Sequence, residues 1–371
     1  MNPDSIRKIL IIATRQIGDT LITTPLIERT HDIWPDAKID FLGFKQATGI
    51  LKDNPFLHAI ISTSRKPTFK EYLSLLRKIT FQYDLAILTQ PSDRCYLYGL
   101  FAAHRRVGVC HRGLEDRGWK QWITSHQVPI DYFRQHVVAE KLHLLDPFME
   151  GKKFTSSISI RPPAFEAIPV ELEEIASSCV VIHPSPLNDY KCWPVQHWLE
   201  LIEFLTKQHI PVIISGGPID KDRQLAISIL ASLSPIALQN TIDMTGKLNF
   251  SALAHLLHLA RAYVGVDTSV THLAAACQTP TIALFGATPP TNFGPWPNGF
   301  SGAQPYQLRA ASQTVGNVTI LQGPGDCVPC RKAGCEDQAN SRSICLEQLS
   351  SARVIQAFDR LEKTYIPIVH S

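Results

Sequence analysis

Short apolar runs rich in β-branched residues alternate with segments of helical periodicity along the whole chain. This alternation is typical of βαβ units, in which helices connect parallel strands and cover the sheet. In the first half the pattern predicts strands at residues 8–13, 38–42 and 85–88 and a helix at 20–34. The fold class is therefore expected to be α/β.

The pattern restarts after a break in composition at residues 161–174, which read RPPAFEAIPVELEE and contain three prolines and four glutamates. Such a stretch is poor material for a packed core and suits a linker. We therefore expect an N-terminal domain at 1–165, a C-terminal domain at 166–345, and a helix in 346–371 that packs back toward the first domain. The other predicted elements are strands at 179–183, 211–215, 263–266 and 281–285 and helices at 195–208, 251–259 and 352–365.

The composition suits two globular domains without a membrane span. The chain has 371 residues, 44% of them hydrophobic, and a formal net charge of +3, which is too small for a protein that coats nucleic acid. No apolar run approaches the roughly 18 residues of a spanning helix, and charges flank the short apolar run near the start, unlike a signal peptide. We expect a soluble, cytoplasmic protein.

Nine cysteines in a long chain without an export signal argue against a disulfide framework. Four of them lie close together near the end of the chain. They could hold a structural zinc or iron, because C-x2-C is a typical half of a metal site, or they could be reduced thiols. In either case we expect no part in catalysis. These four are Cys327, Cys330, Cys335 and Cys345.

A glycine and a carboxylate, Gly18 and Asp19, lie where the first predicted strand turns into its helix. Ligands of open α/β sheets bind at these carboxyl ends of strands. Asp19 is thus a candidate catalytic carboxylate; the alternative is that it only caps the helix, since aspartate is a preferred N-cap residue. The segment has no G-x-G-x-x-G fingerprint, so a nicotinamide cofactor is disfavoured.

Three loops of the second half follow predicted strands and carry groups suited to a nucleotide diphosphate. The first places a lysine ahead of a helix, where ammonium and helix dipole together favour an anion. The second carries an acid that could accept hydrogen bonds from a ribose, and the third is a polar turn at a helix start. Solvation and capping are the alternatives for each loop alone, but convergence of three loops favours a site. The residues are Ser185 and Lys191, then Asp220, then Asp267, Thr268 and Ser269.

Motifs along nearly the whole chain are similar to those of glycosyltransferase family 9, the ADP-heptose:lipopolysaccharide heptosyltransferases. The matching segments are GDTLITTPLI, YKCWPVQHW, SGGPIDKDR, VGVDTSVTHLAAA, TPTIALFGAT and CVPCRKAGC with CLEQL after it. The Lys-Cys-Trp triplet and the cysteine-rich tail most resemble the heptosyltransferase III branch, which adds a side-branch heptose to the inner core.

The resemblance implies a GT-B fold, in which two Rossmann-like domains face a central cleft, the first holding the acceptor and the second ADP-heptose. It implies that Asp19 is the general base and that Lys191 stabilises the diphosphate. Two departures stand out: Ser269 replaces a frequent glycine, and the loop before Lys191 is one residue out of step. The donor contacts implied by the resemblance are Gly18, Ser185, Lys191, Asp220, Asp267, Thr268, Ser269 and His272.

A local basic excess marks the expected acceptor side. Residues 61–120 contain eleven Lys or Arg and five Asp or Glu, although the whole chain carries only +3. Many such charges form solvated faces, but as a set they suit a phosphorylated lipid core and peripheral contact with the cytoplasmic face of an anionic inner membrane. The acceptor contacts we expect are Arg15, Arg94, Arg105 and Arg112.

The leading hypothesis is inverting transfer of heptose from ADP-L-glycero-β-D-manno-heptose to the lipopolysaccharide inner core of a Gram-negative bacterium. Departure of a nucleotide diphosphate requires charge neutralisation, which Lys191 and helix amides can supply, so we favour catalysis that needs no cofactor and no metal. One rival keeps the chemistry and takes a protein as acceptor. A more distant rival is a non-catalytic nucleotide-sugar-binding protein of the same fold.

Overall fold

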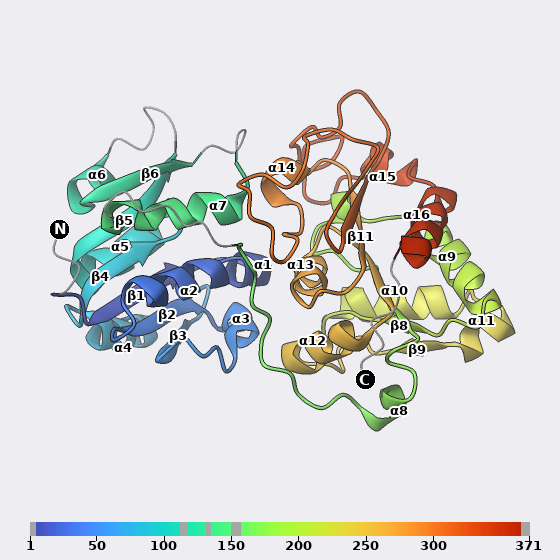
Figure 1. Cartoon of the computed structure of the whole chain (residues 1–371), viewed down its shortest axis with the longest axis horizontal. Helices are drawn as coiled ribbons and strands as arrows, with labels where there is room; N and C mark the ends of the chain where they lie inside the picture. Colours follow the sequence, from blue (N-terminus) through green and yellow to red (C-terminus); the bar gives the residue numbers. More distant parts are fainter. Residues whose placement is uncertain (1–4, 112–117, 131–134, 150–156, 365–371) are drawn as a thin grey trace. The chain divides into compact units, whose positions relative to one another are not determined.

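The structure, a computed structural model, describes residues 5–111, 118–130, 135–149 and 157–364. The chain divides into two compact units, drawn from blue to green and from green to red in Figure 1. The first unit comprises Met1–Ala164 and Ser301–Gln304, and the second comprises Phe165–Phe300 and Pro305–Ser371. The sequence pattern placed its boundary between residues 165 and 166.

The first unit is a parallel sheet with strand order β3-β2-β1-β4-β5-β6. Its central strand, β1, has the nearly uniform apolar sequence KILIIA because both faces of the sheet are covered. The elements are β1 (Lys8–Ala13), α1 (Ile17–Leu21), α2 (Thr24–Ile33), β2 (Lys38–Phe44), α3 (Lys45–Thr48), the 3-10 helix η2 (Gly49–Leu51), β3 (Ala59–Thr63), α4 (Phe69–Ile79), β4 (Tyr83–Leu88), α5 (Asp93–Ala102), β5 (Ala103–His111), α6 (Trp119–Ile123), β6 (His126–Ile130), α7 (Val137–Leu142) and η3 (His143–Phe148).

The helix predicted at 20–34 is in fact two helices, α1 and α2, separated at Ile22 and Thr23. Pro25 lies at the first turn of α2. A proline has no amide proton and its ring clashes with the carbonyl four residues earlier, here that of Leu21, so one continuous helix cannot form. The hydroxyl of Thr24 instead donates to the Leu21 carbonyl at 2.9 Å.

The second unit has strand order β12-β13-β11-β10-β7-β8-β9, in which β12 alone among the described strands runs antiparallel to its neighbour. The hairpin of β12 and β13 turns at Gly316, whose φ is +54°. The elements are α8 (Val170–Glu173), β7 (Val180–His183), η4 (Asp189–Lys191), α9 (Val195–Lys207), β8 (Val212–Ile214), α10 (Asp220–Leu230), α11 (Pro235–Gln239), β9 (Thr241–Asp243), α12 (Phe250–Leu259), β10 (Ala262–Val266), α13 (Ser269–Ala276), β11 (Thr281–Phe285), α14 (Pro290–Phe293), β12 (Ser312–Val315), β13 (Val318–Gln322), α15 (Ile344–Glu347) and α16 (Ser351–Thr364).

The C-terminal helix α16 packs into the core of the second unit. Its residues Val354, Ala357 and Phe358 are buried in the same hydrophobic cluster as Trp198 of α9. The apolar face of the helix is thus buried beside α9. The expectation that the segment 346–371 packs toward the first domain stays a prediction.

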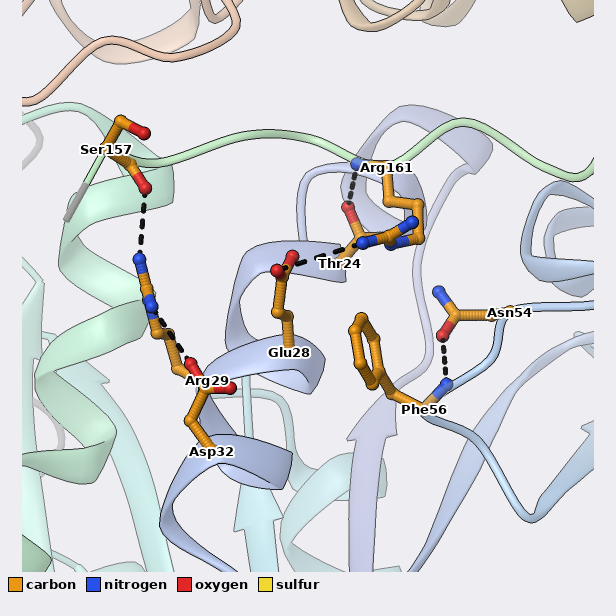
Figure 2. Close-up of polar contacts among 8 residues, drawn as sticks. All are labelled: Thr24, Glu28, Arg29, Asp32, Asn54, Phe56, Ser157 and Arg161. Atoms are coloured by element: carbon orange, nitrogen blue, oxygen red, sulfur yellow. Dashed lines mark hydrogen bonds and ion pairs between the residues drawn. The ribbon is translucent and has the colours of Figure 1, made fainter. Parts of the chain in front are cut away.

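The expected linker at 161–174 begins at Arg161, which is bound to residues of the first unit by a hydrogen bond and an ion pair. Figure 2 shows the Arg161 amide donating to Thr24 Oγ1 at 2.9 Å and the Arg161 guanidinium 3.8 Å from Glu28. The guanidinium also lies over the Phe56 ring, 4.9 Å from its centroid. The connection therefore leaves the first unit from a fixed point on α2.

Candidate functional site

The candidate base Asp19 is the third residue of α1, directly beyond the carboxyl end of β1. The N-cap of α1 is Gln16, and no side chain caps this helix. The alternative that Asp19 serves only as a cap is therefore not supported. Its side chain is half-buried, and within the described residues its carboxylate has no hydrogen bond or ion pair.

A buried lysine that the sequence analysis missed lies behind Asp19. Lys141 of α7 is 4% exposed, and its Nζ donates to the Asp19 carbonyl at 3.0 Å and to Thr23 Oγ1 at 2.7 Å. Burial lowers the pKa of the Lys141 ammonium to about 8, against the opposing effect of the nearby Asp19 carboxylate. The only signal in the sequence was a charged pair, Glu140 and Lys141, within an otherwise apolar segment.

Two arginines gather at the start of α1. The side chain of Arg65 donates to Gln16, and Arg94 Nη1 donates to the Arg65 carbonyl at 2.8 Å. Both guanidinium groups lie over the Phe44 ring, at 5.7 and 5.6 Å from its centroid. The prediction named Arg94 and Arg15, which is exposed beside Gln16; it did not single out Arg65.

The other two expected acceptor residues do not join this group. Arg105 pairs with Leu85 in the sheet, and its Nη1 donates to Ser5 Oγ at 3.2 Å, near the amino ends of the parallel strands. Asp19 lies at their carboxyl ends, so Arg105 is removed from the expected acceptor contacts. Arg112 lies outside the described residues.

In the second unit Lys191 and Asp267 form an ion pair. Lys191 ends η4, Asp267 follows β10, and the Nζ to Oδ2 distance is 2.6 Å, with side-chain exposures of 23% and 9%. Burial alone raises the pKa of the Asp267 carboxyl, but the Lys191 charge, hydrogen bonds from Lys191 and Thr288, and His272 together hold that pKa below its ordinary value. Asp267 is therefore a fixed anion that orients Lys191.

The loops after three neighbouring strands thus meet, because β11, β10 and β7 are adjacent in the sheet. Thr288, which follows β11, was not predicted, although it lies in the TPTIALFGAT segment. Thr268 is the N-cap of α13, and its hydroxyl accepts from the Thr271 amide. Ser269 begins this helix and His272 is buried within it. This arrangement gives a helix N-terminus beside a lysine, which suits an anionic ligand.

A buried, neutral histidine, His183, lies where β7 passes into the loop that follows it. His183 Nδ1 lies 3.0 Å from Ser215 Oγ at the end of β8, and burial lowers the pKa of His183 to about 4. The predicted phosphate contact Ser185 is itself buried. A second lysine, Lys221, binds Asp189 of the same loop at 2.5 Å and was missed by the prediction.

The predicted ribose contact Asp220 is the first residue of α10, and its side chain is 91% exposed. Asp222, two residues on, is buried and accepts a hydrogen bond from the Gly217 amide at 2.7 Å. The expectation of metal-independent chemistry overlooked this D-x-D spacing. The two carboxylates differ in surroundings, since Asp222 closes the Gly-Gly turn while Asp220 reaches solvent.

The cysteine-rich tail does not form a metal site in the part of the chain that the structure describes. There, no group of three or more His, Cys, Asp or Glu side chains is arranged to hold a metal ion. Burial raises the pKa of Cys345 to about 11, and Cys330, Cys335 and Cys327 act in the same direction, so the four thiols lie in one region. Their present arrangement does not fit a zinc or iron ion.

Among the described helices, none is long and apolar enough to span a membrane.

The model of glycosyltransferase family 9 (heptosyltransferase) matches residues 72–309. The chain is 28% identical over 359 residues to lipopolysaccharide heptosyltransferase 3 of Escherichia coli, an alignment that covers 93% of this chain and 96% of the relative. It is 31% identical over 296 residues to the protein of the same name from strain K12, covering 76% and 83%.

Solved structures share the fold. E. coli ADP-heptose lps heptosyltransferase II has a TM-score of 0.70 at 19% identity, covering 96% of this chain and 99% of its own. The dodecameric iron-containing glycosyltransferase TibC of enterotoxigenic E. coli has a TM-score of 0.56 at 14% identity, covering 97% and 77%.

These matches define a glycosyltransferase. The chain belongs to glycosyltransferase family 9, the heptosyltransferases. The expectations of this family, of an enzyme of the glycosyltransferase class and of a GT-B fold with two Rossmann-like domains are confirmed.

Proposed function

We propose that this chain transfers heptose from ADP-L-glycero-β-D-manno-heptose to a heptose of the lipopolysaccharide inner core, with inversion at the anomeric carbon. The relatives named lipopolysaccharide heptosyltransferase 3 support the acceptor. A neighbour of the same fold has been solved with ADP-2-deoxy-2-fluoro heptose, which supports the donor. Residues 1–165 are assigned to the acceptor and 166–345 to the donor.

The observation that carries the proposal is the different state of the two carboxylates at the strand ends. Asp19 has no partner for its carboxylate within the described residues, whereas Asp267 is buried against Lys191. A general base must be free to accept a proton, and an anion paired with a lysine is not. Asp19 therefore takes the proton of the acceptor hydroxyl, whose oxygen attacks the anomeric carbon while the bond to ADP breaks.

The leaving diphosphate is bound by the second unit. Lys191, oriented by Asp267, offers an ammonium, and the amides at the start of α13 offer donors. The remaining donor contacts follow β7, β8 and β10, and Gly18 precedes Asp19 in α1; those of the second unit are Ser185, Asp220, Thr268, Ser269 and His272. These fixed donors neutralise the charge that develops on ADP, so we assign no cofactor and no metal to the chemical step.

The anionic acceptor meets the arginines at the carboxyl ends of the first sheet. Arg15 and Arg94, together with Arg65, are placed near Gln16 at the start of the helix that carries Asp19. Guanidinium groups bind phosphate and carboxylate oxygens in a bidentate manner. A phosphorylated core lipid would also hold the enzyme at the cytoplasmic face of the inner membrane without insertion.

The test is ADP release from ADP-heptose by purified enzyme, measured with heptose-bearing core lipid, with a protein acceptor and with no acceptor. We expect release to depend on the core lipid, and mass spectrometry of core oligosaccharide from a deletion strain to show one missing heptose. ADP release that requires the protein acceptor would show that a protein, and not the core lipid, receives the heptose. Tight binding of ADP-heptose without release under any condition would indicate a non-catalytic binding protein.

A further inference from the structure

The one-turn helix α1 lacks a backbone hydrogen bond at the residue that carries the candidate base. The Thr20 amide bonds to the Gln16 carbonyl and the Ile22 amide to the Gly18 carbonyl, but the Thr23 amide turns to the Thr20 carbonyl. The Asp19 carbonyl is thus left without the amide that would follow it in a longer helix. A helix this short is not stable alone and depends on tertiary contacts.

Two side chains bind this carbonyl instead. Thr23 Oγ1 donates to the Asp19 carbonyl at 2.7 Å, and Lys141 Nζ donates to the same carbonyl at 3.0 Å and to Thr23 Oγ1 at 2.7 Å. The ammonium also lies at the C-terminal end of α1, where a positive charge is favourable. Lys141 comes from α7, which packs beside α2 in Figure 1, so the contact joins segments far apart in the chain.

The junction between α1 and α2, at Ile22 and Thr23, is also held by hydrogen bonds that do not involve Lys141. Thr24 Oγ1 donates to the Leu21 carbonyl and accepts from the Arg161 amide, as the upper part of Figure 2 shows for the second bond. The junction would therefore keep its course without Lys141. What Lys141 adds is a restraint on Asp19 itself.

The restraint requires a charge to be buried. Lys141 is almost completely inaccessible, and desolvation lowers the pKa of its ammonium to about 8. The charged groups that act on it are Asp19, which opposes this lowering, and Arg15, which adds to it. Because burying a charge costs desolvation free energy, stability does not account for Lys141. Its hydrogen bonds to the Asp19 carbonyl and to Thr23 point to a role at that residue.

We propose that Lys141 is a positioning residue: together with Thr23 it fixes the carbonyl of Asp19 and thereby the direction of the carboxylate on the same residue. The inference rests on the proposed role of Asp19 as general base. A carboxylate that must meet one hydroxyl proton tolerates little displacement, because a shift of about 1 Å can cost on the order of 10²-fold in rate.

The experiment compares four variants of the full chain with the wild type and with Asp19→Asn. Lys141→Met keeps the length of the stem and removes the donor, Thr23→Val removes the hydroxyl, and Thr23→Ser keeps it. The matched control is Thr30→Val, because Thr30 is also buried and its hydroxyl also donates to a carbonyl four residues earlier, that of Leu26 at 2.6 Å. It lies on α2, away from Asp19.

We expect kcat to fall about tenfold or more in Lys141→Met and Thr23→Val, with KM for the donor within about threefold. Thr23→Ser and Thr30→Val should stay within about threefold of wild type in both constants. The melting temperature of Lys141→Met should not fall, since a desolvated charge is removed and the Thr23 hydroxyl still donates to Asp19. Amide hydrogen exchange at residues 17–23 should accelerate in Lys141→Met and Thr23→Val only.

Wild-type kcat and exchange in Lys141→Met would overturn the inference, as would equal losses in Thr23→Ser and Thr23→Val. A fall in kcat that only follows a lowered melting temperature would also overturn it. If Asp19→Asn loses turnover while Lys141→Met does not, the proposed base stands and the positioning role alone fails. If Asp19→Asn turns over normally, the assignment of the base fails, and the exchange data still report whether Lys141 restrains α1.

Discussion

The two units of this enzyme treat a carboxylate at a strand end in opposite ways. In the first unit the Asp19 carboxylate has no described partner, and the surrounding bonds go to its backbone carbonyl. In the second unit the Asp267 carboxylate is itself bound, by Lys191 at 2.6 Å and by Thr288. In the first unit the backbone of Asp19 is held and its carboxylate is left without a described partner. In the second unit the carboxylate of Asp267 itself holds Lys191 in place.

The difference shows how similar sheets acquire different chemistry. A free carboxylate on a restrained backbone suits proton transfer, whereas a paired one orients a cation toward an anionic ligand. The sequence position of an aspartate after a strand does not distinguish these cases. The partner does, and the partner comes from another part of the unit.

The largest expected effect comes from Asp19→Asn. The amide keeps the size of the side chain but cannot take a proton, so turnover should fall by on the order of 10²–10⁴. Donor affinity, measured by calorimetry with ADP-heptose, should stay within a few-fold because the donor belongs to the second unit. Near wild-type turnover would contradict the contrast drawn between the two carboxylates and would leave Asp19 without a catalytic role.

The second-largest effect is expected from Lys191→Met, which removes the ammonium and leaves the buried Asp267 carboxylate without its cationic partner. Turnover should fall by about 10²-fold with a weakened donor dissociation constant, and magnesium should not restore either. The stranded charge should also lower the unfolding free energy, by about 3 kcal/mol.

The control for Lys191 is the double variant Lys191→Met with Asp267→Asn. It carries no stranded charge, so the stability should return while turnover stays low. Recovery of turnover in the double variant would mean that Lys191 acts only through stability.

A smaller effect is the pH dependence of the second unit's stability through His183. The pKa of this histidine is about 4 when folded and near its ordinary 6.5 when unfolded, so between these values the unfolded chain binds more protons. Stability is therefore complete above pH 6.5 and is lost as the pH falls toward 4, by about 3 kcal/mol in all. Melting temperatures of the wild type and of His183→Asn, which does not titrate, should converge or cross over this range; parallel curves would contradict the burial of a neutral imidazole.

The smallest effect is expected from Cys330→Ser in the cysteine-rich tail. Turnover should be unchanged, because within the described residues the hydrogen bonds between the tail and the second site involve none of the thiols: they join Ala339 to Asp189, Ser343 to Tyr190 and Arg331 to Ala287. The melting temperature should shift by only about a few degrees. Elemental analysis of the purified enzyme should give zinc and iron well below one equivalent. A full equivalent of metal in the wild type, lost with a large drop in melting temperature in the variant, would show that the thiols rearrange around an ion.

The local pattern of the sequence was sufficient for seven strands and for the loops that follow them, but it missed six others of the described chain, β3, β5, β6, β9, β12 and β13. The predicted strands at 8–13 and 281–285 agree with β1 and β11 in their bounds, because a strand covered on both faces needs an uninterrupted apolar run. The pattern failed at Ile22 and Thr23, where Pro25 interrupts a helix whose periodicity continues. The sequence also predicted both Arg105 and Arg94 as acceptor contacts, because charge alone does not tell at which end of the parallel strands a residue lies.

What the sequence by itself determined is the family, the two α/β units and the presence of Asp19, Lys191 and Asp267 beyond the carboxyl ends of strands. Only the tertiary structure decided which of these carboxylates is paired, that Arg65 joins Arg94, and that Lys141 lies behind Asp19. The physical reason is distance along the chain: Lys141 and Asp19 are 122 residues apart. No periodicity, cap or turn signal of either segment records the other, since such signals extend over a few residues. Contacts of this kind exist only once the sheet has brought the helices together.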